Sequence, residues 1–562
     1  MTEWISKPQK DGATALIVRG KTIPRAVVQI LQNRGYHDTK AIEGYFAPSL
    51  DQLHDPFLLG DMERAADRLI RAISNKERVL VHGDYDTDGI TACAMIVSVL
   101  QHQGIEVEYY IPHRIEEGYG LSMSGVAYAQ EKGCTLLITV DCGITALDEV
   151  SHARKCGIDV VITDHHKPPA ELPRDCLIIN PTRPDDPYPF KELAGIGVAF
   201  KLVQALFDKL QMPRESAHEY LDLVALGTVV DVVPLIDENR ILVKHGLHRM
   251  LKSRNHGIRA LLEETGLQKG VTAYHLGFVI GPRINACGRV SDARAALELL
   301  LTSDETKAAR LAHMLSTDNK KRQAIEDQIL KDAIVRVTEG RFDEDRVLVL
   351  ADTAWHEGIV GIVASRMSDQ FQKPTVLLTL KQTSAKGSAR SVPGFDITDA
   401  LRTCHDLLSR YGGHSQAAGL ELDRSKIPEL RRRLNEHARE FEPAVFEKKY
   451  TYDIELAFED ITKEVLHFLK YLEPTGVANP QPVFLGSGLE VVGVPRVVGS
   501  DHLKFALRSN DCAFEAIAYG KGQMILDIEV GKTRVDCLYS ISEDSFFKKK
   551  KVVIKIKDIK KV

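Results

Sequence analysis

The sequence has no long apolar run, and its cysteines are scattered. No apolar stretch approaches the ~20 residues that a membrane-spanning helix needs, and the first residues, MTEWISKPQK, lack the apolar core of a signal peptide. The nine cysteines form no CxxC pair, which argues against a disulfide framework or a zinc ribbon. We therefore expect a cytoplasmic protein that has no membrane partner.

The chain also lacks a strong excess of charge of either sign. Its formal net charge is only -5 over 562 residues, so any surface that binds phosphate must be local. Hydrophobic residues make up 44% and charged residues 27%, which is typical of a soluble globular protein. The length allows several domains, each with its own buried core.

Strand-like and helix-like segments alternate in the first half of the chain. The expected strands are apolar throughout, as in a sheet that is covered on both faces. This alternation predicts βαβ units and a mostly parallel sheet. The expected strands are 78–81, 106–111, 136–140, 160–163 and 177–179, and the expected helices are 89–103, 124–132 and 145–155.

The fold class that we predict is α/β with a small β-barrel at the end. Polar helical periodicity over 303–338 favours a long helix that connects two lobes. A second α/β unit would contain strands 347–350 and 374–380, helices 359–370 and 397–408, and a glycine turn at Gly412-Gly413. We assign 1–60 to a helical lead-in, 61–300 to the first domain, 301–342 to the connecting helix, 343–445 to the second domain and 446–562 to the barrel.

The strongest motif is His82-Gly83-Asp84-Tyr85-Asp86-Thr87-Asp88-Gly89. Its three carboxylates stand at the end of an expected strand, just before a helix, and would raise one another's pKa. A divalent cation removes this conflict; oxygen ligands suit Mg²⁺ or Mn²⁺, and imidazole favours Mn²⁺. A solvated acidic turn and a calcium loop are the alternatives, although residues 91–93 offer no carboxylate for a calcium loop.

Three further sites carry similar side chains. Asp141 and the Asp164-His165-His166 triplet each follow an expected strand, and parallel strands bring such ends to one edge of a sheet. Asp231 lies in the apolar run Gly227–Pro234, where burial is costly unless the carboxylate is paired or binds metal. Taken singly, Asp141 could cap a helix, the histidines could be surface residues, and Asp231 could mark a helix end.

These four motifs resemble those of the DHH phosphoesterase superfamily: Asp-x-Asp-x-Asp-Gly, Val-Asp-x-Gly, Asp-His-His and Gly-Thr-x-x-Asp-Val-Val-Pro. The resemblance implies two Mn²⁺ or Mg²⁺ ions that hydrolyse phosphodiester bonds. Asp84 and His166 would support the ligands or contact phosphate, and Cys142 stands where the superfamily usually has Asn. The metal ligands that the resemblance implies are His82, Asp86, Asp88, Asp141, His165 and Asp231, with Asp141 as the bridge.

The remaining motifs resemble the single-strand-specific 5′→3′ exonucleases of this superfamily. In those enzymes, such residues contact the phosphates and the terminal nucleotide, and arginine suits a bidentate phosphate contact. A structural pairing of arginine with Asp292, an exposed loop and plain glycine turns are the alternatives. The substrate-binding residues that the resemblance implies are Arg114, Tyr119, Arg283, Asn285, Arg289, His356, Ser388, Arg390, Gly412, Gly413 and His414.

The last segment resembles an oligonucleotide-binding barrel. Basic residues interleaved with aromatic ones fit a platform that binds single strands regardless of sequence, although a lysine run is usually just solvated surface. The residues concerned are Lys504, Phe505, Phe546, Phe547 and Lys548–Lys551.

The resemblance implies that the chain binds single-stranded DNA with a 5′ end and works beside a single-strand-binding protein and a helicase. It also implies a role in DNA recombination and repair. We expect the chain to act as a monomer. Two alternatives stay open: a phosphodiesterase for short oligonucleotides or cyclic dinucleotides, and a non-catalytic DNA-binding scaffold.

Overall fold

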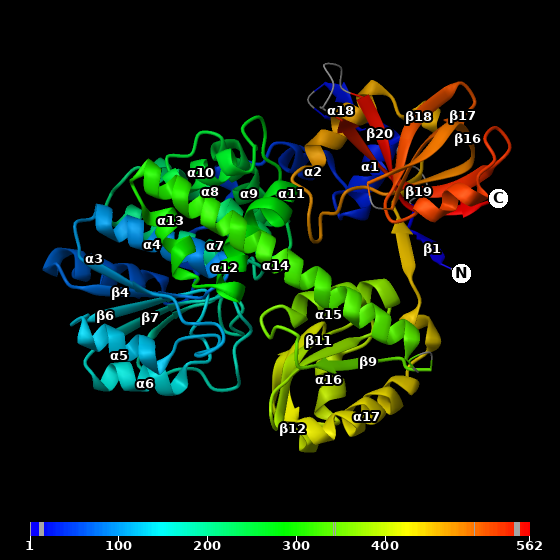
Figure 1. The fold of residues 1–562 in the computed structure, drawn as a ribbon. Coiled ribbons are helices and arrows are strands. Elements are labelled where there is room, and N and C mark those ends of the chain that lie inside the picture. Colours follow the sequence, from blue (N-terminus) through cyan, green and yellow to red (C-terminus); the bar gives the residue numbers. More distant parts are fainter. Residues whose placement is uncertain are drawn as a thin grey trace. The chain divides into compact units, whose positions relative to one another are not determined.

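The computed structural model describes residues 2–9, 16–18, 20–340, 342, 344–499, 501–544 and 551–562. The chain divides into two compact units, each with its own core (Figure 1). The larger unit comprises 54–233 and 237–448, and the smaller unit comprises 1–53, 234–236 and 449–562. Of the residues expected on the barrel, Phe546, Phe547 and Lys548–Lys550 lie outside the described residues.

The larger unit begins with a five-stranded parallel sheet in the order β5-β4-β6-β7-β8. The predicted strands are confirmed, and the side chains of the three central strands, β4, β6 and β7, are almost all buried because helices cover both faces. Helices α3, α4 and α7 lie on one face and α5 and α6 on the other (Figure 1). The strands are β4 (Val79–Gly83), β5 (Val107–Tyr110), β6 (Leu136–Val140), β7 (Asp159–Thr163) and β8 (Leu177–Ile179), and the helices are α3 (Met62–Asn75), α4 (Thr87–His102), α5 (Met123–Glu131), α6 (Leu147–Lys155) and α7 (Gly195–Lys209).

A helical region completes this part of the unit and ends in the predicted connecting helix. Asp304 caps that helix, because its carboxylate accepts hydrogen bonds from the N–H groups of Thr306 and Lys307. One five-residue segment, Leu276–Ile280, is a π-helical turn between α11 and α12. The helices are α8 (Leu221–Val230), α9 (Asp237–Met250), α10 (His256–Glu264), α11 (Ala273–His275), α12 (Gly281–Val290), α13 (Arg294–Leu301) and α14 (Glu305–Glu339).

A second sheet, in the order β12-β13-β11-β10-β9, follows α14 in the same unit. Two expectations are wrong here: the helix ends at Arg402 rather than at 408, and Gly412-Gly413 lies inside a strand rather than in a turn. A Cβ at Gly413 would lie 2.2 Å from the Ala417 carbonyl oxygen, so glycine here permits a close strand approach. The elements are β9 (Leu348–Asp352), α15 (Val360–Phe371), β10 (Thr375–Leu380), β11 (Ser384–Arg390), α16 (Ile397–Arg402), β12 (Leu408–His414), β13 (Ala417–Asp423) and α17 (Ile427–Arg439).

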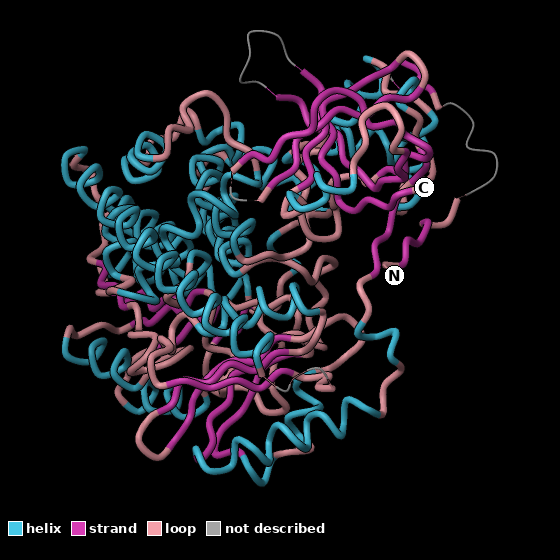
Figure 2. The backbone as a smooth tube through the Cα atoms, turned by 45° about the vertical axis from the view of Figure 1, so that its right-hand side comes forward, coloured by secondary structure: helices cyan, strands magenta, loops and turns pink. Residues whose placement is uncertain are grey.

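The smaller unit is built on the predicted closed barrel, whose strands appear in magenta in Figure 2. The ring closes where the first barrel strand pairs with the fourth along the chain. The lead-in shares its core: Val27, Ile30 and Leu31 pack with barrel residues. The barrel strands are β16 (Phe484–Val498), β17 (His502–Ser509), β18 (Cys512–Ala518), β19 (Arg534–Asp544) and β20 (Lys551–Lys561), beside β15 (Ile454–Glu455) and α18 (Lys463–Leu469).

The lead-in is less purely helical than expected. Besides α1 (Arg25–Asn33) and α2 (Thr39–Phe46), it contains β2 (Ile17–Val18), β3 (Lys21–Thr22) and β1 (Glu3–Ser6). Strand β1 pairs in parallel with β14 (Lys449–Tyr452), an association between segments far apart in the chain that local sequence does not indicate.

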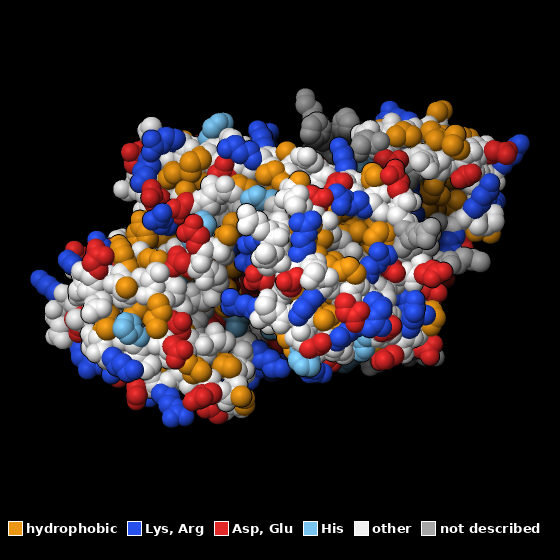
Figure 3. Space-filling view, turned by 60° about the horizontal axis from the view of Figure 1, so that its bottom comes forward, with side chains coloured by type: hydrophobic (Ala, Val, Ile, Leu, Met, Phe, Trp, Pro, Cys, Tyr) orange, Lys and Arg blue, Asp and Glu red, His pale blue; other side chains and the backbone are white. Residues whose placement is uncertain are grey.

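Two surface properties bear on possible partners. Within the described residues, no helix combines the length and apolar character that crossing a membrane requires. Figure 3 shows acidic and basic side chains interspersed over the face in view, as the small net charge suggests. A phosphate-binding region must therefore be sought in local clusters rather than in bulk charge.

Candidate metal and phosphate site

The carboxyl ends of three neighbouring strands meet at one edge of the first sheet. Gly83 pairs in register with Val140, and Val140 with Thr163. The expected acidic and histidine residues follow these three positions directly: Asp84 to Asp88, Asp141, and Asp164 to His166. Parallel pairing thus gathers them as the sequence predicted.

The first motif is held by backbone N–H groups. The Asp86 carboxylate caps α4 by accepting from the N–H groups of Asp88 and Gly89. The two carboxylate oxygens of Asp88 accept from the N–H groups of Gly195 and Ile196, at 2.6 Å and 2.9 Å, at the start of α7. Both helix N-termini favour a negative charge at these positions.

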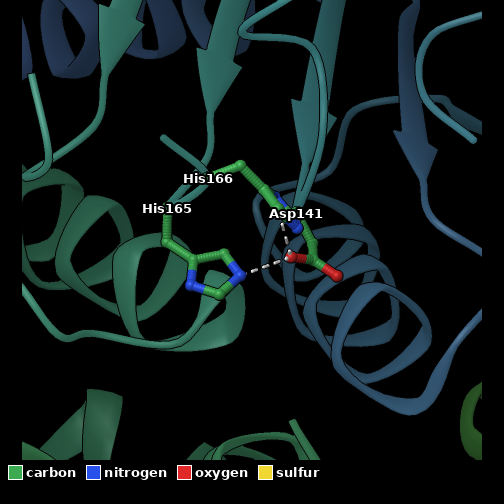
Figure 4. A group of neighbouring side chains, drawn as sticks. All are labelled: Asp141, His165 and His166. Atoms are coloured by element: carbon green, nitrogen blue, oxygen red, sulfur yellow. Dashed lines mark ion pairs between the residues drawn. The ribbon is translucent and has the colours of Figure 1, made fainter. Parts of the chain in front are cut away.

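Asp141 lies at the centre of the site. Its backbone has a φ of 59° and it caps no helix, because α6 begins after Ala146. Figure 4 shows His165 and His166 beside its carboxylate: the Asp141 Oδ1 lies 3.2 Å from His165 Nε2 and 4.0 Å from His166 Nδ1. His165 Nε2 also lies 3.6 Å from Asp231 Oδ2, which brings in the fourth motif from the end of α8.

Among the described residues, three overlapping groups have ligand atoms within 4.8 Å of one another. Asp141 and His165 each belong to two groups, so the three form one continuous cluster. The groups are Asp141 with His165 and His166, Asp88 with His165 and Asp231, and Asp84 with Asp86 and Asp141.

The cluster fits divalent cations. Four of its buried atoms have no hydrogen-bond partner in the described structure: Asp84 Oδ1, Asp141 Oδ1, His165 Nε2 and Asp231 Oδ2. Unpaired buried oxygen and imidazole atoms are costly unless an ion satisfies them. Hard oxygen donors together with imidazole are the donor set of Mn²⁺ and Mg²⁺ sites.

The electrostatics of the metal-free cluster point the same way. Burial, followed by repulsion from neighbouring carboxylates, raises the pKa values of Asp84, Asp88 and Asp141 well above their ordinary value. Burial also raises the pKa of Asp231, against the opposing effect of His165. Bound cations would favour the ionised carboxylates that the protein alone disfavours.

One contributing residue had not been assigned a role from sequence. Asp164 is fully buried, and its Oδ1 lies 2.7 Å from His166 Nδ1 and accepts from the N–H groups of both histidines. Although burial opposes it, this contact lowers the pKa of Asp164 and raises that of His166. The Tyr119 hydroxyl contacts the same nitrogen at 2.8 Å, so Tyr119 belongs to the site despite its half-exposed ring. The sequence signal that could have indicated a role for Asp164 is an acidic residue directly before two histidines, at the end of an apolar strand.

His82 is the one expected ligand that stands outside the three groups. Its ring stacks on Tyr110, and its Nε2 faces Gly125, where an added Cβ would lie 2.9 Å away. Burial lowers its pKa to about 4, so it is neutral at neutral pH. Its Nδ1 lies 3.8 Å from the Sγ of Cys142, so the unusual Cys packs against this histidine.

A cluster of arginines lies near the metal cluster in the same unit. Burial first, and then the charges of Arg114 and Arg322, lower the pKa of Arg289 to about 9. Burial and Arg114 also lower the pKa of Arg390. Arg114 itself lies over the Tyr85 ring at 4.6 Å. Cations that destabilise one another in this way would bind an anion tightly.

The second sheet contributes the start of a helix to this arginine cluster. The Arg390 guanidinium donates to the Ser388 Oγ at 2.6 Å. A Cβ at Gly361, in the first turn of α15, would lie 3.2 Å from both side chains. A helix N-terminus beside serine and arginine is suited to phosphate. Arg289 also donates to the Gly358 carbonyl at 2.9 Å, just before α15.

Two residues that are expected to contact phosphate also have partners within the protein. Arg283 donates to the Ser316 Oγ at 3.0 Å and to the Val279 carbonyl, and the alternative partner Asp292 pairs with Arg294. The Asn285 Oδ1 accepts from both the N–H and the hydroxyl of Thr87, at 2.8 Å each. These contacts brace the first motif and the π turn.

The other residues of the second sheet that are expected to bind substrate are not among the residues of the metal cluster. The His356 Nδ1 accepts from the Gly358 N–H at 3.1 Å, in the loop that precedes α15. Gly412, Gly413 and His414 lie on the exposed edge strand β12. These three residues are exposed and pair with β13, and their role in substrate binding stays a prediction.

Comparison with known families agrees with this division of the chain. Residues 78–228 match the DHH family, N-terminal domain, residues 344–440 match the DHHA1 domain, and residues 452–558 match the RecJ OB domain.

Curated relatives and solved structures agree as well. The single-stranded-DNA-specific exonuclease RecJ of Bacillus subtilis is 36% identical over 99% of this chain and 70% of its own length, and that of Thermus thermophilus is 37% identical over 84% and 67%. Crystal structures of Thermus thermophilus RecJ in complex with Mn²⁺ and with Mg²⁺ have TM-scores of 0.82 and 0.77, at 32% and 30% identity. These matches cover 96% of this chain and 76% and 75% of those chains.

Proposed function

Since the chain belongs to the RecJ family of single-stranded-DNA-specific exonucleases, we propose that it hydrolyses single-stranded DNA from the 5′ end. The products would be 5′-mononucleotides. The observation that carries the proposal is the buried cluster of unpaired carboxylate and imidazole atoms at the aligned strand ends.

In this proposal, two Mn²⁺ or Mg²⁺ ions bind at the cluster. The residues that would hold them are Asp84, Asp86, Asp88, Asp141, His165 and Asp231, with Asp141 shared by two of the three groups. Two such ions supply a hydroxide-like water near neutral pH and neutralise charge on the phosphate during in-line displacement. His82 stands outside the three groups, its buried Nε2 likewise has no hydrogen-bond partner among the described residues, and its role as a ligand stays a prediction.

The protein's own groups orient the scissile phosphate. Asp164 fixes the His166 ring, which would place His166 to contact a phosphate oxygen. The Tyr119 hydroxyl contacts the same ring nitrogen, Nδ1, at 2.8 Å. The backbone N–H groups of Gly195 and Ile196 fix Asp88, which limits the movement of the cluster.

The arginine cluster explains how a 5′ end would be selected. We assign the terminal phosphate to Arg114, Arg289, Ser388 and Arg390, because an anion relieves the mutual repulsion of these cations. Bidentate guanidinium contacts suit a phosphate that carries two charges. A strand interior lacks that group and would bind more weakly.

The family also suggests the setting in which the chain works. The barrel matches the RecJ OB domain, a fold that binds single strands in a groove. We propose that the protein is a cytoplasmic monomer that acts in DNA recombination and repair. Its substrates would be strands that a helicase exposes and a single-strand-binding protein covers. Pull-down with each partner would test these associations separately from catalysis.

The decisive assay uses long 5′-phosphorylated single-stranded DNA that is labelled at one end or the other, with Mn²⁺. Release of labelled mononucleotide from the 5′ end at the first turnover, without cleavage of duplex and without cleavage by Asp86→Ala, is the expected result. Cleavage from the 3′ end, or of duplex equally well, would contradict the proposal. Cleavage of only short oligonucleotides or cyclic dinucleotides would replace it with the small-substrate activity.

A further inference from the structure

Two exposed aromatic rings precede α12: Tyr274 lies on α11 and Phe278 on the π turn that follows it. Tyr274 is 64% exposed and Phe278 is 71% exposed, although large apolar side chains are usually buried. Their rings stack on each other, with centroids 4.9 Å apart and planes 25° apart. Stacking covers one face of each ring and leaves the outer faces to solvent.

Gly281, the residue that directly follows the π turn, packs beside two of the metal cluster's motifs. A Cβ at Gly281 would lie 2.4 Å from a methyl group of Val230, and Asp231 is the next residue. The Gly281 carbonyl accepts from the hydroxyl of Thr87, which stands between Asp86 and Asp88. The turn is therefore continuous with two of the cluster's motifs, and π turns often occur at functional sites.

Another exposed apolar side chain, that of Val232, lies next to the metal cluster in the sequence. Val232 directly follows Asp231, has a φ of 67° and is 64% exposed. A β-branched residue in that backbone region is strained, so the fold holds it there against a cost. The last cluster residue thus leads into exposed apolar surface rather than back into the core.

We infer that Tyr274 and Phe278 form a stacking platform for the bases of the single strand whose 5′ end lies at the metal cluster. This inference rests on the proposed function and names how that site holds its substrate. Every base has a π face, so stacking tolerates any sequence. Duplex bases are already stacked on one another, so the platform favours single strands. The pairing of the two rings also contributes to helix stability, but that role needs no exposed face.

The test scans one abasic residue along a 5′-phosphorylated single strand and measures first-nucleotide release with Mn²⁺. With natural DNA, Phe278→Leu should raise KM roughly 5- to 100-fold, the range of one base–aromatic stack, and leave kcat nearly unchanged. When the abasic residue stands at the position that the rings contact, there is no base to stack, so wild type and Phe278→Leu should show the same KM. Phe278→Tyr keeps a stacking ring and should behave as wild type.

Three outcomes would overturn the inference. An unchanged KM for both Phe278→Leu and Tyr274→Leu excludes the platform. If Phe278→Leu raises KM relative to wild type by the same factor at every abasic position, the rings act on something other than a base, such as a protein partner. Wild type that releases no nucleotide refutes the proposed function itself, which separates the two failures. Thermal unfolding of each variant controls for folding, because the exposed rings contribute little to the core.

Discussion

Gly195 is the position where a single methyl group would test the centrality of Asp141. A Cβ there would lie 2.4 Å from Asp141 Oδ1 and 2.6 Å from its Cβ. Relief to an ordinary contact of 3.4 Å requires a shift of about 1 Å by Asp141 or by the start of α7. Movement of α7 would instead pull the Gly195 N–H away from Asp88, so either response distorts the cluster.

The expected magnitudes follow from that shift. Misplacement by about 1 Å costs on the order of 100-fold in catalytic rate, and disturbance of a ligand's surroundings costs about 10- to 100-fold in metal affinity. Overpacking should cost about 1–3 kcal/mol in unfolding free energy. Gly270→Ala is the matched control, because its Cβ would meet nothing within 4 Å.

The assay is titration calorimetry with Mn²⁺, beside strand cleavage at saturating metal. Gly195→Ala should bind Mn²⁺ more weakly and cleave slowly even when loaded, whereas Gly270→Ala should match wild type. Wild-type affinity and rate in Gly195→Ala would refute the reasoning, because the cluster would then tolerate displacement of its central carboxylate.

Three further predictions concern charge. Lys201→Met should lower the unfolding free energy by about 3–5 kcal/mol in chemical denaturation, because it leaves Glu238 buried without its cation; a loss as small as that of a surface substitution would contradict this. Arg390→Ala should lower kcat/KM roughly 10- to 100-fold on 5′-phosphorylated strands, the value of a charged hydrogen bond, and little on 5′-hydroxyl strands; equal losses would argue against a 5′-phosphate contact. The raised pKa values of Asp84 and Asp141 mean that the folded, metal-free protein holds protons that the unfolded chain has lost. Its stability should therefore fall as pH rises from the ordinary carboxyl range through the raised values, and thermal unfolding should show the stabilisation by Mn²⁺ growing with pH; a constant difference between Mn²⁺ and EDTA would count against coupled carboxylates.

Periodicity and strand-end chemistry were enough to predict the first sheet and the cluster at its edge. Strands β4, β6 and β7 are continuously apolar, and parallel register then fixes where the residues after them must lie. The long helical pattern of α14 was similarly clear, and the structure has a helix there, as the local sequence favours.

Sequence reasoning failed where long-range pairing decides the structure. Gly412-Gly413 looks like a turn locally, but its pairing with β13 makes it a strand. The lead-in strand β1 depends on a partner that lies far along the chain. The internal partners of Arg283 and Asn285 are Ser316 and Thr87, which also lie elsewhere in the chain, and the assignment of these two residues to substrate stays a prediction. No local pattern reveals which partner a side chain will find.

The most direct test of the central claim is the number of Mn²⁺ ions that each chain binds, measured by calorimetry and by anomalous diffraction. Wild type should bind two neighbouring ions at the ends of β4, β6 and β7, and Asp141→Asn, the substitution at the shared carboxylate, should lose this pair. Wild type that degrades single strands with no ion, or with ions bound elsewhere, would contradict that claim.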